Sequence, residues 1–188
     1  MDDGETAMIG RHSTILLLAA LAIGSSAGSL AQYGPRPSKY TSPAVSASAL
    51  IAGKKIGVDY FAPSMHGRKI MGGLVPFGVV WCTGANIATR LSTEAPLHMG
   101  DLDLPKGEFS IWTLPGDKEW KLIVNKETGQ FHLNYNAQLD FGRTTMNLKT
   151  LTAPVETFRI EVRNDGGNKG TLALIWEKTE ASIPFTVR

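Results

Sequence analysis

The chain has 188 residues, of which 43% are hydrophobic and 19% charged, with 19 basic residues, 17 acidic residues and a single cysteine. The hydrophobic fraction excludes a disordered chain, the balanced charge argues against a nucleic-acid-binding domain, and one cysteine cannot form a disulfide scaffold. The length is that of one domain. With 20 glycines and 10 prolines, the composition indicates short elements joined by tight turns.

The first segment has the pattern of a signal peptide. The stretch 13–23 is apolar over 11 residues, fewer than the about 20 that a membrane-spanning helix needs. Small residues follow, and Ser29 and Ala31 occupy the two positions that a signal peptidase pocket accepts, which predicts cleavage after Ala31. Acidic residues before the apolar stretch do not fit this pattern, whereas a start at Met8 would leave Arg11 as the expected positive charge. The alternative is a hydrophobic first element of the domain.

These features predict an exported protein, periplasmic or secreted. We expect a signal peptide over 1–31, a leader over 32–42 and a single domain over 43–188. No cysteine follows the apolar stretch at the cleavage site, and no later apolar stretch is long enough to span a membrane. The mature protein is therefore expected to be soluble, without a membrane anchor after cleavage.

Alternating apolar residues predict β-strands after the leader. Ile56, Val58 and Tyr60 share one face of a strand, and the turn 52–54 joins this strand to 45–51 as a hairpin. The same alternation, separated by turn residues, recurs at 87–91, 97–99, 102–104, 108–114, 119–125, 158–163, 172–176 and 183–187.

This pattern predicts an all-β fold, an antiparallel β-sandwich of jelly-roll or immunoglobulin-like type. At most one or two short helical turns are expected, one within 67–78 and one within 136–143. Pro184 lacks a backbone N–H, which predicts an edge or a bulge in the last strand.

One segment, 60–86, interrupts the alternation with five glycines and two prolines. Long ordered loops are uncommon in compact domains and often functional. Its side chains, joined by one later arginine, offer a cation, a flat apolar face, a hydroxyl and an amide, which together suit a neutral or weakly anionic polar ligand such as a sugar or a peptide end. In the alternative interpretation, the same groups only satisfy the loop's own backbone and fill the sandwich. The candidate ligand-binding residues are Arg68, Trp81, Thr83, Asn86 and Arg143.

The loop also carries a resemblance to a known family. Two strings in the loop carry the resemblance, namely Gly-Arg-Lys-Ile-Met-Gly-Gly-Leu-Val-Pro-Phe-Gly at 67–78 and Trp-Cys-Thr-Gly-Ala-Asn at 81–86. Together with the segments 104–110 and 172–187, they resemble the domain-of-unknown-function family 2911. The resemblance implies an exported bacterial protein of β-rich fold with no established activity. The chain departs from the family pattern at Cys82, where an arginine is expected. If that arginine holds an anionic ligand, this chain has lost the contact; if it only braces the loop, the departure has no functional consequence.

Other chemistry is not indicated by the sequence. The lone Cys82 is predicted to be a buried thiol rather than a reactive one. His66, His98 and His132 stand at no metal-ligand spacing, so no metal site is predicted, and no nucleophile elbow, phosphate loop or dinucleotide motif suggests a cofactor.

Two functions remain open. The first is a non-catalytic exported binding module for a small polar ligand, a glycan or a protein partner, acting through the loop 67–86. The second is a hydrolase of envelope or extracellular material with a site beside the same loop. The absence of a local catalytic constellation favours the first. No nucleic-acid partner is expected, and the sequence leaves the oligomeric state open.

Overall fold

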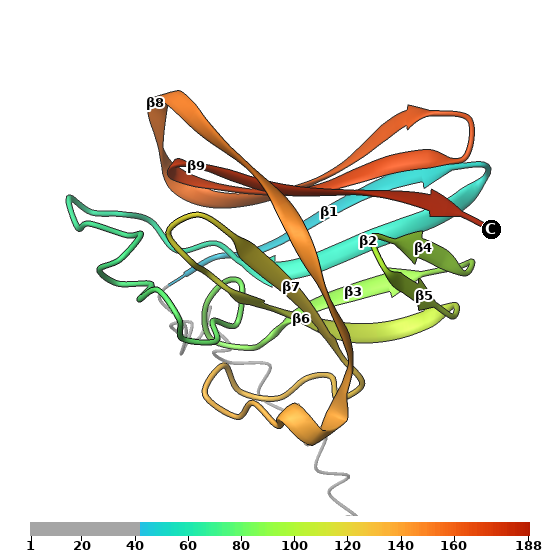
Figure 1. Ribbon diagram of the computed structural model, residues 1–188, viewed down its shortest axis with the longest axis horizontal. Helices are drawn as coiled ribbons and strands as arrows, with labels where there is room; N and C mark the ends of the chain where they lie inside the picture. Colours follow the sequence, from blue (N-terminus) through green and yellow to red (C-terminus); the bar gives the residue numbers. More distant parts are fainter. Residues whose placement is uncertain (1–41) are drawn as a thin grey trace, which may run out of the picture. The chain divides into compact units, whose positions relative to one another are not determined.

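The computed structural model describes residues 42–188, so the predicted signal peptide and nearly all of the predicted leader lie outside the described residues. The regular structure of the described part consists of β-strands and one 3₁₀ turn (Figure 1). The prediction of an all-β fold is therefore confirmed. All ladders between the strands are antiparallel.

Nine strands form a sheet in the order β1-β2-β3-β6-β7-β8-β9-β4-β5. The 3₁₀ turn η1 (Ala137–Leu139) precedes β8. The strands are β1 (Ala44–Ile51), β2 (Lys54–Phe61), β3 (Thr89–Thr93), β4 (Leu97–Met99), β5 (Leu102–Leu104), β6 (Gly107–Leu114), β7 (Trp120–Asn125), β8 (Asp140–Gly166) and β9 (Lys169–Val187).

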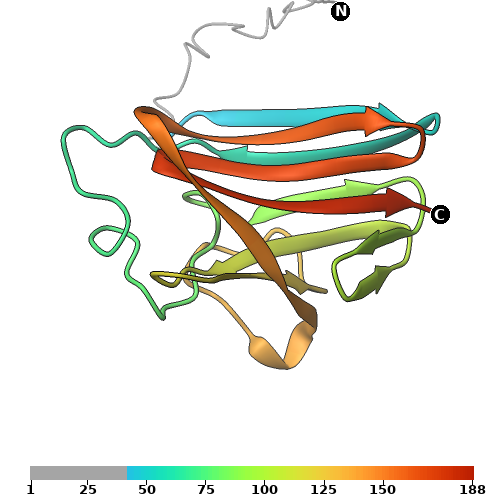
Figure 2. The same ribbon diagram turned by 45° about the horizontal axis from the view of Figure 1, so that its top comes forward.

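The long strand β8 passes from one layer of the sandwich to the other. Its first part pairs with β7 as far as Met146, and from Asn147 onward it pairs with β9. Because β9 also pairs with β4, the sheet folds over itself, with β1, β2, β3, β6 and β7 in one layer and β9, β4 and β5 in the other. Figure 2 shows β8 crossing diagonally between these layers.

The apolar side chains of the alternating strand positions fill the space between the layers. Apolar side chains at every second position of the strands are buried. Removing each large aliphatic or aromatic side chain from water stabilises the fold by about 1.5–3 kcal/mol. The interior includes Ile56, Val58, Tyr60, Phe109, Ile111, Leu122, Val124, Leu172, Leu174 and Trp176.

The opposite face of β6 and β7 is also buried, under a second apolar cluster. Trp112 and Ile123 lie there with Cys82 and Ala88, and Tyr135 packs against them. The Trp112 indole donates to Ser110 Oγ at 3.0 Å, and its ring lies 5.0 Å from that of Tyr135. Two loops, 62–88 and 126–139, supply the residues that cover this face, which places both loops on the outside of the same layer.

One of the two expected helical turns is present. Residues 137–139 form η1, with the Asn136 side chain accepting a hydrogen bond from the Gln138 N–H at 3.0 Å as an N-cap. No helical turn forms within 67–78. Gly72 and Gly78 adopt positive φ there, and the Val75 N–H bonds back to Ile70 O, so that successive tight turns replace a helix.

The end of the chain explains the position of its proline. The two strands expected at 172–176 and 183–187 are one strand, β9, with shifts of its register against β8 on both sides of Glu177. Pairing with β8 ends at Ser182, and pairing with β4 begins at Phe185. Pro184 lies between these two ladders, where its missing N–H leaves no ladder hydrogen bond unmade.

Candidate functional site

A pocket of about 510 Å³ opens beside the loop 62–88, which connects β2 to β3. This volume lies within the range of small-molecule sites. The loop supplies most of the wall, and the rest comes from Ser42, from His132 and Leu133 of the 126–139 loop and from Trp176 of β9. We call this cavity the loop pocket. Three of the five predicted site residues line it, namely Arg68, Trp81 and Asn86.

The wall of the loop pocket contains two stacked indole rings. Trp81 and Trp176 have ring centroids 5.8 Å apart at an interplanar angle of 23°, and Phe158 contacts both rings. Trp81 is held in place because its backbone exchanges hydrogen bonds of 2.8 and 2.9 Å with Thr113 and its indole N–H donates to Gly84 O at 3.2 Å. The partly buried Trp81 ring therefore presents a fixed apolar face.

Exposed aliphatic side chains surround this aromatic wall. Leu74, Val79 and Leu133 line the loop pocket and are 48%, 53% and 77% exposed. Side chains of this size are normally buried, and a group of them around a concavity is typical of a binding surface.

Asn86 brings an amide group to the pocket. It adopts φ of +63°, a left-handed conformation that asparagine tolerates better than most residues. Its carbonyl accepts the His132 N–H at 3.0 Å, and its side-chain nitrogen lies 3.5 Å from Ser42 O, at the outer limit for a hydrogen bond. Within residues 42–188 its side-chain oxygen has no hydrogen-bond partner, so this acceptor remains available to a ligand.

Arg68 is held at the pocket by main-chain oxygens. Its Nε donates to Met65 O at 2.9 Å and its Nη2 to Ser64 O at 2.7 Å. The side chain is otherwise exposed. The guanidinium is thus fixed in place by neutral acceptors of its own loop.

Two carboxylates anchor the loop to the strands behind it. Glu177 of β9 accepts the Met71 N–H at 3.0 Å and the Ile70 N–H at 3.4 Å. Glu156 of β8 accepts the His66 N–H at 2.8 Å. Glu177 itself has φ of +51°, and this unusual backbone conformation accompanies the contact that holds the loop. These anchors fix the wall that carries Arg68.

Thr83 lies beneath the pocket rather than on its wall. It is fully buried, its hydroxyl is 3.3 Å from Thr113 Oγ1, and its carbonyl accepts the Thr89 hydroxyl at 2.7 Å. Its φ is +57°. In this position Thr83 supports the turn between Trp81 and Asn86 and does not face a ligand.

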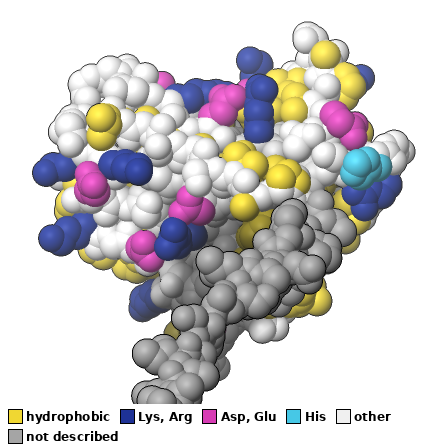
Figure 3. Space-filling view, turned by 180° about the vertical axis from the view of Figure 1, so that it is seen from behind, with side chains coloured by type: hydrophobic (Ala, Val, Ile, Leu, Met, Phe, Trp, Pro, Cys, Tyr) yellow, Lys and Arg dark blue, Asp and Glu magenta, His cyan; other side chains and the backbone are white. Residues whose placement is uncertain are grey.

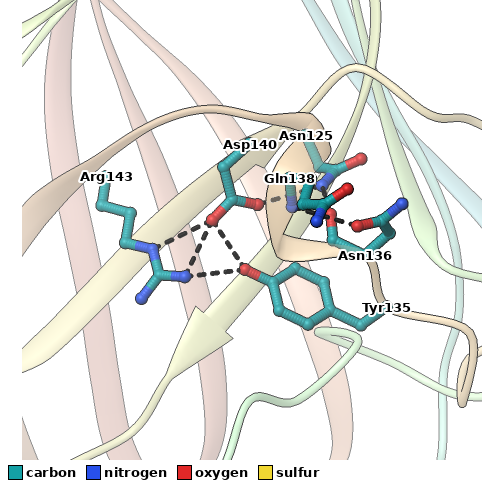
Figure 4. Close-up of polar contacts among 6 residues, drawn as sticks. All are labelled: Asn125, Tyr135, Asn136, Gln138, Asp140 and Arg143. Atoms are coloured by element: carbon teal, nitrogen blue, oxygen red, sulfur yellow. Dashed lines mark hydrogen bonds and ion pairs between the residues drawn. The ribbon is translucent and has the colours of Figure 1, made fainter.

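Arg143 lies in a separate cluster at the start of β8, drawn in Figure 4. Its guanidinium donates to Asp140 Oδ2 at 2.8 and 3.0 Å and to the Tyr135 hydroxyl at 2.9 Å. Tyr135 in turn donates to Asp140 at 2.7 Å, and Asn125 donates to the other carboxylate oxygen at 3.0 Å. Burial, reinforced by the hydrogen bond to Asp140, raises the pKa of Tyr135 to about 12. We call these four residues the Tyr135 network. Arg143 does not line the loop pocket.

Cys82 is a buried thiol, as predicted. Its Sγ donates to Gly84 O at 3.3 Å, and burial raises its pKa to about 12. The thiolate, which is the reactive form, is therefore suppressed at neutral pH. Although Cys82 touches the loop pocket, it is not suited to act as a nucleophile there.

The sequence analysis did not assign His132 and Leu133 to the site. Their loop is brought beside 86–88 by hydrogen bonds from Ala88 N to Gln130 O and from His132 N to Asn86 O, both 3.0 Å. Burial lowers the pKa of His132, which favours the neutral imidazole. The signal in the sequence that points to this loop is the apolar pair Phe131 and Leu133 among the polar neighbours Gln130, His132 and Asn134. In the structure both apolar side chains are exposed.

Charges elsewhere on the surface are mixed. Figure 3 shows basic and acidic side chains interspersed on the face seen from behind, with hydrophobic side chains gathered between them. Arg90 exemplifies this mixing, since it pairs with Asp59 at 2.6 Å and with Glu108 at 3.3 Å. Within residues 42–188 there is no cluster of three or more metal-ligating side chains, and no helix there is long and apolar enough to cross a membrane.

Comparison with known proteins identifies the family. The family model described as "Protein of unknown function (DUF2911)" matches residues 42–185. The chain belongs to this family. No curated protein and no solved structure matches the chain. The matched range of this DUF2911 protein contains the whole loop 62–88 and every strand except the last residues of β9.

The loop pocket of the DUF2911 protein brings together side chains of four kinds. The pocket offers a fixed indole face, an amide, a guanidinium and a neutral imidazole. Within residues 42–188, no hydrogen bond joins the His132 ring to a hydroxyl or a thiol of the pocket, so the pocket holds no assembled nucleophile and base.

Proposed function

We propose that this DUF2911 protein is an exported, non-catalytic binding module. Its loop pocket takes a small ligand that has an apolar face and a polar, hydrogen-bonding edge. The observation that carries the proposal is the convergence of Trp81, Asn86 and Arg68, three residues of different chemistry, on one concave site. Export rests on the apolar stretch 13–23 and the small residues after it.

The apolar side of the site supports binding of a flat or aliphatic group. A ligand that covers the Trp81 face and the exposed Leu74 and Val79 would remove these side chains from water, at about 25 cal/mol for each Å² buried. Because Trp81 is already fixed by Thr113 and Gly84, binding would lose little side-chain entropy there.

The polar side supports selection of the ligand. The side-chain oxygen of Asn86, which has no partner among residues 42–188, can accept a hydrogen bond from a ligand, and the side-chain nitrogen can exchange its long contact to Ser42 for a better one. A polar group in this position discriminates most strongly against an analogue that lacks the matching group, because the analogue leaves the polar group without a hydrogen bond. Asn86 is therefore expected to decide which ligands bind.

The alternative of a hydrolase finds less support. The Cys82 thiol is neutral because burial raises its pKa to about 12, and the Glu156 and Glu177 carboxylates beside the loop accept backbone N–H groups. A hydrolytic site would need two of these groups to meet at one reacting atom.

A thermal-shift screen of the purified protein against sugars, short peptides and metal ions tests the proposal. We expect a ligand that raises the unfolding temperature of the wild type and loses most of this effect in Asn86→Ala. The matched control is Asn147→Ala, because Asn147 is an exposed asparagine of β8 that does not line the pocket. A ligand shift that is unchanged in Asn86→Ala would place the binding site elsewhere.

A further inference from the structure

We infer that the ligand of the loop pocket carries a carboxylate, which Arg68 binds, and that it is the carboxyl end of a peptide with an apolar last side chain. This inference rests on the proposed function and specifies its ligand. It starts from the contrast between Arg68 and the other arginines of the described part.

Every other arginine within residues 42–188 forms an ion pair with a carboxylate, and Arg68 forms none. The partner distances are between 2.6 and 3.1 Å. The paired residues are Arg90 with Asp59, Arg143 with Asp140, Arg159 with Glu161, Arg163 with Glu180 and Arg188 with Asp103. Arg68 is thus the arginine whose positive charge the described residues leave uncompensated.

The hydrogen bonds of Arg68 leave the part of the guanidinium that suits a carboxylate. A guanidinium has five N–H groups, of which Arg68 uses the one on Nε and one on Nη2 for the carbonyls of Met65 and Ser64. Within residues 42–188, both N–H groups of Nη1 and the second N–H group of Nη2 have no hydrogen-bond acceptor. These donors form the end of the fork, which matches the two oxygens of a carboxylate.

The nearby acids do not compete for this position. The Glu177 carboxylate holds the N–H groups of Ile70 and Met71, and one oxygen of Glu156 holds that of His66. Because two carbonyls already fix the Arg68 side chain, a ligand carboxylate would meet an ordered cation, and less conformational entropy would be lost on binding.

Other groups that line the loop pocket with Arg68 match the rest of a peptide end. Asn86 can both donate to and accept from a peptide group, as a backbone amide requires. Leu74, Val79 and Trp81 line the same pocket and provide apolar contacts for a side chain of the size of leucine. A carboxylate, an amide and an apolar group at neighbouring positions define the last residue of a peptide.

The experiment compares two probes that differ only in the terminal group, which is a carboxylate in one and a neutral amide in the other. Acetyl-Ala-Ala-Leu with a free carboxylate and the same tripeptide with a terminal amide are titrated into the full chain by calorimetry at neutral pH. We expect the acid to bind about tenfold more tightly than the amide, in keeping with a charge-assisted, two-point hydrogen bond. A carrier protein that ends in the same three residues tests whether a protein carboxyl end enters as readily as a free peptide.

Variants assign the difference to Arg68. Arg68→Met is expected to reduce the affinity for the acid about tenfold and to leave that for the amide unchanged, whereas Arg68→Lys, which keeps the charge and loses the fork, falls between. Arg188→Met is the matched control, since Arg188 pairs with Asp103 and does not line the pocket. For the wild type alone, added salt is expected to weaken binding of the acid more than that of the amide.

Equal affinity for acid and amide would overturn the inference, as would an equal loss of both in Arg68→Met or failure of both probes to bind. If the two probes bind equally and both lose affinity in Asn86→Ala, the loop pocket is still a binding site and only the carboxylate is wrong. If the ligand found by the thermal-shift screen is indifferent to Asn86→Ala, the proposed function itself fails.

Discussion

The loop pocket and the Tyr135 network each place an arginine on the outside of the sandwich, but the two arginines are engaged differently. Arg143 donates to a carboxylate and a phenol that are themselves hydrogen-bonded, so its charge and its donors are matched within the protein. Arg68 donates to two neutral carbonyls, which fix its position and leave its charge open. The first arrangement satisfies the arginine within the fold, and the second is the arrangement on which the proposed carboxylate site rests.

This contrast shows why residue type is a weak guide to function. Both residues are arginines beside aromatic side chains, and the sequence analysis grouped them as candidates for one ligand. What separates them is the partner, which is Asp140 in one region and the backbone at Ser64 and Met65 in the other. The following changes test whether the two regions differ in this way.

The largest expected effect concerns Cys82, which touches the loop pocket and also packs in the cluster beneath Tyr135. Because burial raises its pKa to about 12, we expect a thiol reagent at pH 8 to modify the folded protein roughly 100-fold or more slowly than the unfolded protein. Stopped-flow absorbance with and without denaturant measures both rates. Equal rates would mean that the thiol is accessible in the folded protein.

Removal of the carboxylate of the Tyr135 network is expected to destabilise the protein. Asp140→Ala leaves Arg143, Tyr135 and Asn125 without their shared partner, and we expect the free energy of unfolding to fall by about 2–3 kcal/mol. Urea denaturation measures it. The control is Asp117→Ala, an exposed turn residue whose loss should change the free energy by less than about 0.5 kcal/mol. Equal effects of the two substitutions would contradict the role given to Asp140.

Exchange of each arginine for methionine tests the comparison directly. Arg143→Met is expected to lower the free energy of unfolding by about 1 kcal/mol, because its partly exposed ion pair is lost, and to leave ligand affinity within about twofold. Arg68→Met should do the reverse, with a smaller loss of stability and a weaker affinity for the acid probe. Denaturation and calorimetry on the same samples give both quantities. A loss of ligand affinity in Arg143→Met would contradict the separation of the Tyr135 network from the loop pocket.

The smallest expected effect is on stability at alkaline pH. The pKa of Tyr135 is raised from 10.0 to about 12, so between pH 10 and 12 the unfolded chain releases this proton while the folded protein retains it. The stability contributed by Tyr135 is therefore complete below pH 10 and is lost as the pH rises through 12. Tyr135→Phe should show a shallower decline of unfolding free energy over this range. Tyr60, whose pKa burial also raises, contributes equally to both proteins.

Much of the fold could be predicted from the sequence because local patterns decide it. The hairpin of β1 and β2 follows from Ile56, Val58 and Tyr60 on one face and a turn predicted at 52–54. In the structure Ile51 pairs with Lys54, so the turn itself is Ala52 and Gly53. The strands from β4 to β7 follow in the same way. The burial of Cys82 follows from the general preference of free cysteine.

The course of β8 could not be predicted in this way. Between Asn147 and Thr157 its side chains are mostly exposed and follow no alternation, since this stretch passes around the corner between the layers instead of packing on one face. Glu177 likewise gives no local sign of its left-handed backbone. Both depend on how two distant segments pair, which a single sequence does not report.

The candidate site also has a part that could be predicted from the sequence and a part that could not. The loop 62–88 stands out because its glycines and prolines interrupt the strands, and Arg68, Trp81 and Asn86 within it line one pocket. Thr83 lies beneath the turn because it contacts Thr113 of β6, 30 residues further along the chain. Arg143 lies in another cluster because its strand pairs with β7, where Arg143 stands opposite Ile123, while its carboxylate partner Asp140 lies three residues before it on the same strand. The short spacing of Asp140 and Arg143 is visible in the sequence, but the strand pairing that keeps them away from the loop pocket is not.

The corner of β8 lies between the two regions along one strand. Between Thr150 and Arg159 this strand has more residues than the segment of β9 opposite, from Ile175 to Thr179, so the surplus bows outward between two well-paired stretches. Arg143 lies before the corner, and Phe158, which contacts both Trp81 and Trp176, lies near its end. One strand thus carries both the arginine of the Tyr135 network and the ring that contacts both indoles of the aromatic wall.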